Sequence, residues 1–144
     1  MDKTRNRMVF LLSLVGIVIA IYVLQSFIRQ SPIVCVNTGC ETVRKSAQSY
    51  IFGVPVPAFG LVGYTALAIL AFVQTVNTEQ KTATKLLKWM LGVATFGVLF
   101  VSWFTYTELF IIRAVCTWCA VSTVNMLIIF ALTLASYQKA KTKA

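Results

Sequence analysis

Acidic residues are scarce in this chain. Only four of its 144 residues are aspartate or glutamate, 12% are charged, 58% are hydrophobic, and the mean hydropathy is +0.81. Soluble domains carry about 25% charged residues. The composition therefore excludes a soluble globular domain and predicts an integral membrane protein.

Four apolar stretches approach the roughly 20 residues that a helix needs to cross the hydrocarbon core. They predict spans at 8–28, 57–76, 89–106 and 114–137. The first follows three basic residues, as in a signal peptide, but it is long, has no Ala-x-Ala site and precedes three further spans, so it is expected to stay as an anchor. Without repeats or a second domain, the expected fold is all-α, a four-transmembrane-helix bundle forming one domain over 1–144.

Basic residues predict the orientation. Most of them lie in the two tails and in the loop between the second and third spans, at Lys3, Arg5, Arg7, Lys81, Lys85, Lys88, Lys139, Lys141 and Lys143. Cytoplasmic segments hold an excess of lysine and arginine, so both termini are expected in the cytoplasm. The location is then the cell membrane, or the endoplasmic reticulum membrane in a eukaryote.

The net charge of +9 does not indicate nucleic-acid binding. The basic residues are scattered at helix ends instead of forming one stripe with interleaved aromatic residues. Topology and contact with anionic lipid explain them, so the lipid membrane is an expected partner and nucleic acid is not.

Cysteine is the main nucleophile, and its four copies form two pairs on the predicted outer side, where disulfides persist. Cys35 and Cys40 lie in the outer loop, 29–56, and an asparagine and a glycine between them permit a turn in which the sulfurs approach. Cys116 and Cys119 open the last span, where residues three apart share a helix face. Electrons pass between dithiols when a thiolate attacks a facing disulfide, so the two pairs predict a thiol relay.

The segment after Cys40 is predicted to form a short interfacial helix over the mouth of the bundle. Apolar residues recur at helical spacing from Val43 to Tyr50 or Ile51, until a glycine and a proline end the pattern. Ser46 on this helix is a candidate to hydrogen-bond a thiolate or a substrate oxygen, although an exposed or capping serine is the commoner case.

A mostly apolar stripe continues the Cys119 face of the last span. Thr123 and Met126 follow at helical spacing, and Phe130 lies about two turns further on. A flat lipophilic ring could bind against Thr123 and Met126; the alternative is that the stripe packs on a neighbouring helix. Asn125 points away from this face and is expected to bond between helices.

These residues carry a resemblance to a known family. The pattern comprises Cys35-x4-Cys40, Val43, Ser46, Gly53-Val54-Pro55, Gly60, Tyr64 and Cys116-Thr117-Trp118-Cys119. It resembles the vitamin K epoxide reductase family in its prokaryotic form, over roughly Pro32 to Leu127. The combination is far more specific than a lone CxxC.

The resemblance implies a bundle around a quinone such as ubiquinone or menaquinone, with no metal. By position, Cys119 faces the quinone, Cys116 exchanges with Cys40, and Cys35 meets a thioredoxin-fold, DsbA-like partner that introduces disulfides into secreted proteins. Ser46 stays a candidate catalytic residue. Because the chain ends without a fused partner, the partner is expected in trans.

Two departures from the animal members concern the quinone ring. Those members have a tyrosine four residues after the CxxC and an asparagine near the start of the second helix, where this chain has Thr123 and Val56. The departures weigh against vitamin K epoxide reduction and coumarin sensitivity, but not against dithiol oxidation by a respiratory quinone, and vitamin K-type quinones stay among the expected acceptors. Bacterial reductases of the DsbB type place their CxxC in the first outer loop, the reverse of the order here.

Three interpretations therefore compete. The first is a thiol:quinone oxidoreductase that generates disulfides. The second is a membrane scaffold whose cysteines form two inert disulfides. The third is a zinc module that uses all four thiolates, and four-cysteine zinc sites are typically structural parts of folded domains. A proton-coupled transporter is less favoured still, since no predicted span contains a carboxylate.

Overall fold

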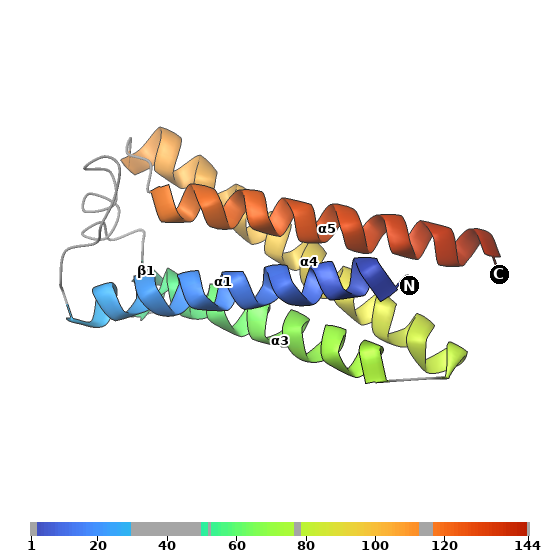
Figure 1. Ribbon diagram of the computed structural model, residues 1–144. Coiled ribbons are helices and arrows are strands. Elements are labelled where there is room, and N and C mark those ends of the chain that lie inside the picture. Colours follow the sequence, from blue (N-terminus) through green and yellow to red (C-terminus); the bar gives the residue numbers. More distant parts are fainter. Residues whose placement is uncertain (1–2, 30–49, 52, 77–78, 113–116, 144) are drawn as a thin grey trace.

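The computed structural model describes residues 3–29, 50–51, 53–76, 79–112 and 117–143. Four long helices in this part of the chain run alternately in opposite directions and form a bundle (Figure 1). They are α1 (Lys3–Arg29), α3 (Val56–Val76), α4 (Gln80–Tyr106) and α5 (Thr117–Lys143). A π-helix, η2 (Thr107–Ile112), prolongs α4.

Four helical stretches among the described residues are long and apolar enough to cross a membrane, and the third runs from α4 into η2. These stretches are Thr4–Ser26, Val56–Val76, Lys81–Ile111 and Ala120–Lys139. A helix satisfies its backbone hydrogen bonds internally, which is what allows it to cross hydrocarbon. The prediction of a multi-pass, helical membrane protein is confirmed.

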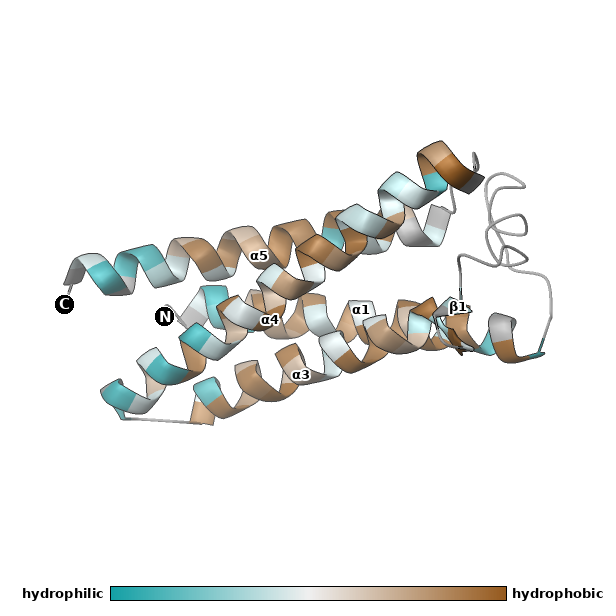
Figure 2. Ribbon diagram, turned by 180° about the vertical axis from the view of Figure 1, so that it is seen from behind, coloured by the Kyte–Doolittle hydropathy of each residue, from teal (hydrophilic) through white to brown (hydrophobic). Residues whose placement is uncertain are grey.

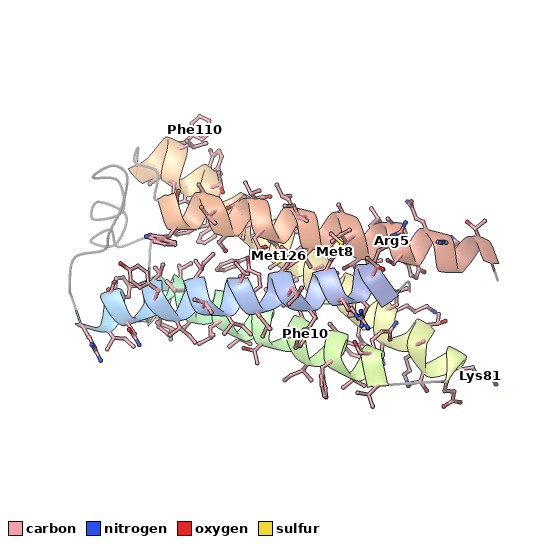
Figure 3. All side chains as sticks on the ribbon, in the orientation of Figure 1. Arg5, Met8, Phe10, Lys81, Phe110 and Met126 are labelled. Carbon is pink, nitrogen blue, oxygen red and sulfur yellow. The ribbon has the colours of Figure 1, made fainter. Side chains whose placement is uncertain are left out.

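Large apolar side chains cover the outside of the bundle. Val18, Val62, Ile69, Phe96 and Leu99 are all well exposed, as expected of side chains that face lipid tails. Hydrophobic residues dominate the middle of the helices, and hydrophilic residues gather at the end that holds both termini and the α3–α4 connection (Figure 2). This end also carries Arg5 and Lys81 (Figure 3). The hydrophobic middle of the bundle is thus followed, at the end with the termini, by a basic region.

The closest packing joins α1 to α3. Small residues allow it: Ala71 of α3 is fully buried, and Gly16 of α1 lies directly against the ring of Tyr64. Asn6 Nδ2 of α1 donates a hydrogen bond to the Ala71 carbonyl at 3.0 Å. Asn125 Nδ2 of α5 donates to the Leu12 carbonyl of α1 at 3.0 Å, which confirms the predicted bond between helices.

The outer loop is described only near its end. The greater part of the predicted interfacial helix lies outside the described residues, but its expected last positions are not helical. Tyr50–Ile51 form strand β1, which pairs antiparallel with β2 (Val54–Pro55). Gly53 has φ of +80°, a conformation that glycine adopts readily and that reverses the chain here. The helical pattern through Tyr50 or Ile51 was therefore a wrong prediction at those two residues.

Candidate functional site

A cavity of about 890 Å³ lies between the helices and is partly open to the outside of the bundle, since exposed side chains such as Val62 and Phe96 belong to its wall. Helices α1, α3, α4 and α5 all contribute to this wall. Small-molecule sites are typically about 300–1,000 Å³ and mostly apolar, with a few polar groups. Among the described residues, this wall follows that pattern: its polar side chains, apart from tryptophan, are Tyr64, Lys85, Lys88, Ser122 and Thr123. The cavity suits a lipophilic ligand.

The polar groups of the wall lie at two levels of the bundle. Ser122 and Thr123 belong to the second turn of α5, whereas Lys85 and Lys88 belong to the first turns of α4. The two helices begin at opposite ends of the bundle (Figure 1). The hydroxyl groups therefore lie toward the end where α5 begins, and the ammonium groups lie toward the end with the termini.

One face of α5 forms part of the cavity wall near the start of that helix. Trp118, Ser122, Thr123 and Met126 all line the cavity, and Met126 points toward the interior of the bundle (Figure 3). Cys119 lies in the first turn of α5, and residues three and four positions apart share a helix face. The cavity thus begins one turn from position 119, on the face that the sequence indicated.

Aromatic side chains line the cavity where α3 and α4 meet. The ring centroids of Phe59 and Phe100 are 5.9 Å apart across the two helices, and Phe100 also contacts the Trp103 ring at 6.0 Å. Near the start of α5, the Trp118 and Tyr22 centroids are 5.2 Å apart, which ties α5 to α1. Tilted pairs at such distances are favourable aromatic arrangements.

Tyr64 is fixed by contacts of both its ring and its hydroxyl group. Its side chain is 2% exposed, and its ring packs against Gly16. Its hydroxyl donates to the Ser122 carbonyl at 3.0 Å and lies 3.0 Å from Ser122 Oγ. Thr123 Oγ1 lies 3.5 Å from Thr105 Oγ1 of α4, a longer contact. Hydroxyl groups from three helices therefore meet near one part of the wall.

The predicted site residues are only partly described. Cys35, Cys40, Ser46 and Cys116 lie outside the described residues, and Cys119 is described only as a backbone position in α5. The structure places Thr123 and Met126 together at the cavity wall. Their binding of a quinone stays a prediction.

Glu108 contradicts the expectation that no span contains a carboxylate. Helical conformation continues from Tyr106 through η2, and the third apolar span extends to Ile111, so Glu108 falls inside it. The side chain is 2% exposed. The predicted third span ended at residue 106, before Glu108, because a charged residue normally marks the end of an apolar run. Ionisable residues within spans usually mark function, and π-helical turns are frequent at functional sites.

Two residues of the wall were missed as site candidates. Ser122 is three positions after Cys119, so helical spacing alone could have identified it. Tyr64 contributed only to the family pattern, since nothing in its own sequence neighbourhood indicates that it reaches α5. Its hydroxyl meets Ser122 across 58 positions of the chain.

The fold and the cavity together define a class: a multi-pass helical membrane protein with an interior site for a lipophilic ligand beside the start of its last helix. The model of the vitamin K epoxide reductase family matches residues 7–134. The chain belongs to this family. No curated protein matches it.

Family membership confirms the resemblance seen in the cysteine pattern. It makes the chain a membrane oxidoreductase of a quinone-related family. The acceptor, the electron donor and the role of each cysteine are finer questions.

Proposed function

We propose that this protein is a membrane thiol:quinone oxidoreductase. It passes electrons from a thioredoxin-fold partner through Cys35 and Cys40 to Cys116 and Cys119, and then to a quinone. The product of this reaction is disulfide bonds outside the cytoplasm.

One observation carries the proposal: the apolar cavity begins one turn from position 119, the second cysteine of the CxxC. A quinone has an apolar ring and tail, and its two carbonyl oxygens need hydrogen-bond donors once water is absent. The wall has this composition, with apolar and aromatic side chains over most of its area and with Tyr64, Ser122 and Thr123 toward the start of α5. The residues present therefore fit such a ligand.

The chemistry at the cysteines balances in two exchanges. In the first, the dithiol of Cys116 and Cys119 loses two electrons and two protons and closes to a disulfide. A quinone, when bound, accepts those two electrons and two protons. In the second, a thiolate of the Cys35 and Cys40 pair attacks the helical disulfide, so that the loop pair becomes oxidised while the helical pair becomes a dithiol again.

The loop pair completes the proposal by exchanging with a protein partner. Its disulfide is attacked by the dithiol of a thioredoxin-fold protein, which leaves oxidised and restores the loop dithiol. The basic end formed by the termini and the α3–α4 connection supports a cytoplasmic location for that end. The cysteines then work on the opposite side, where disulfides persist.

Quinone reduction by the purified protein tests the proposal, with a short-chain ubiquinone analogue as acceptor. We expect the wild type to turn over with a small dithiol. Alanine at Cys116 or Cys119 should abolish turnover. Alanine at Cys35 or Cys40 should leave turnover with the small dithiol but block electron transfer from a thioredoxin-fold protein. Equal loss in all four variants with the small dithiol would contradict the division into two pairs.

A wild type whose thiols never respond to the quinone would instead support the scaffold with inert disulfides. Thiols that bound metal protects from alkylation would support the zinc module.

A further inference from the structure

The hydrogen bond between Tyr64 and Ser122 differs from the commonest hydroxyl contact in the described part of the bundle. Helical serine and threonine hydroxyls commonly bond to the carbonyl four residues earlier. Ser13, Thr107 and Thr133 do so here, at 2.7 to 3.0 Å. The hydroxyl of Ser122 instead lies 3.0 Å from the hydroxyl of Tyr64, across two helices and at the cavity wall.

The two hydroxyl groups carry two protons, while one carbonyl, that of Ser122 itself, lies within hydrogen-bond distance of Tyr64. If Tyr64 donates to the Ser122 carbonyl, the Ser122 hydroxyl can donate either to the phenol oxygen or to another acceptor. If Tyr64 donates to Ser122 Oγ, the Ser122 proton must point elsewhere. A ligand carbonyl at the cavity wall can therefore accept from Ser122 in either arrangement, and in the first it replaces the bond from Ser122 to the phenol oxygen.

We propose that Ser122 Oγ donates the hydrogen bond that holds one carbonyl oxygen of the quinone ring, and that Tyr64 is the positioning residue that orients this hydroxyl. This inference rests on the proposed function. Ser122 is three residues after Cys119, so a ring held by Ser122 lies about one helical turn from position 119 of α5. The rest of the wall is largely apolar and would bind the ring and its tail.

Tyr64 is suited to positioning because it has little freedom. Its ring is buried against Gly16, where even a Cβ would come within 2.4 Å of the ring. A fixed phenol hydroxyl restricts the rotation of the Ser122 hydroxyl and strengthens its donated bond by polarisation. Removing the phenol hydroxyl should therefore weaken quinone binding without a change in packing.

Binding of a short-chain ubiquinone analogue to the oxidised protein tests the proposal, with quenching of tryptophan fluorescence as the measure of affinity. Trp118 at the wall provides the signal. Ser122→Ala and Tyr64→Phe should each raise the Kd roughly 3- to 10-fold, the range expected for a lost hydrogen bond between neutral groups. Ser122→Thr keeps the hydroxyl and should bind like the wild type.

Thr65→Val is the matched control, because Thr65 neighbours Tyr64 on α3 but its hydroxyl bonds to the Leu61 carbonyl on an exposed face. It should leave the Kd unchanged. The infrared carbonyl band of the bound quinone gives a second readout. The band should move to higher frequency in Ser122→Ala and Tyr64→Phe but not in Thr65→Val. A structural defect alone would not produce this selective shift.

Three outcomes would overturn the proposal. Ser122→Ala could bind with wild-type affinity and an unshifted carbonyl band while the wild type reduces quinone, which removes the inference and leaves the proposed function standing. Thr65→Val could weaken binding as much as Ser122→Ala, which makes the effect nonspecific. A wild type that neither binds nor reduces the quinone would remove the proposed function together with the inference.

Discussion

Gly16→Ala should destabilise the bundle, because Gly16 lies where α1 and α3 approach most closely. A Cβ at this position would lie 2.4 Å from Cδ1 and Cε1 of the Tyr64 ring and 2.6 Å from Cγ. Contacts this short force a displacement, and the ring is buried and bonded through its hydroxyl to Ser122. Overpacking of a well-packed core costs about 1–3 kcal/mol. At roughly 2–4 °C per kcal/mol, the thermal midpoint should fall by about 2–12 °C.

Gly92→Ala is the matched control, since a Cβ at Gly92 meets no atom within 4 Å. Alanine favours a helix over glycine by up to about 1 kcal/mol, so this variant should be neutral or slightly stabilised. Thermal unfolding in detergent, followed by circular dichroism, measures both. Gly16→Ala should also weaken quinone binding, because the ring that moves carries the hydroxyl beside Ser122. A Gly16→Ala protein as stable as Gly92→Ala would refute the packing argument. In a double-mutant cycle, Gly16→Ala should cost less stability in a Tyr64→Ala background than in the wild type.

Gly97, Glu108 and the loop cysteines give three more tests, two of packing in the bundle and one of orientation in the membrane. Gly97→Ala should cost less stability than Gly16→Ala, because its Cβ would meet only the flexible end of Met126, at 2.8 Å from Cε, and the difference in thermal midpoints checks this. Glu108→Ala should lower the stability by about 1–3 kcal/mol because the contacts of this buried side chain are lost, whereas the nearly isosteric Glu108→Gln should cost less; equal loss in both would argue against this reason. A membrane-impermeant thiol reagent should label Cys35 and Cys40 in intact, reduced cells, and protection of both until the cytoplasm is opened would reverse the proposed orientation.

The site was predictable where it depends on spacing along one helix. Thr123 and Met126 were expected on one face of the last span, and both line the cavity. Helical spacing could also have identified Ser122. It could not have identified Tyr64, because the role of Tyr64 depends on a contact with α5 that only the packing of the helices creates. The loop cysteines stay predictions, since they lie outside the described residues.

The class of protein, the number of long spans and the family were all predictable from the amino-acid sequence. These follow from local quantities: the length of each apolar run and the spacing of the cysteines and glycines. The prediction from sequence was wrong at the end of the third span. It ended the span before Glu108, but this side chain is buried and the span continues past it. It failed also at Tyr50–Ile51, where strand pairing replaced the helical pattern.

Which faces of the helices meet could not be predicted and is known from the packed bundle. In a soluble helix the apolar face is the buried face, so sequence periodicity reveals it. In a membrane the lipid-facing side is apolar as well, and the rotation of each helix is set by close contacts between small and polar residues. Gly16 against Tyr64, and Tyr64 against Ser122, are such contacts. They fix the hydroxyl groups and the cavity beside the start of α5, because no helix alone brings these residues together.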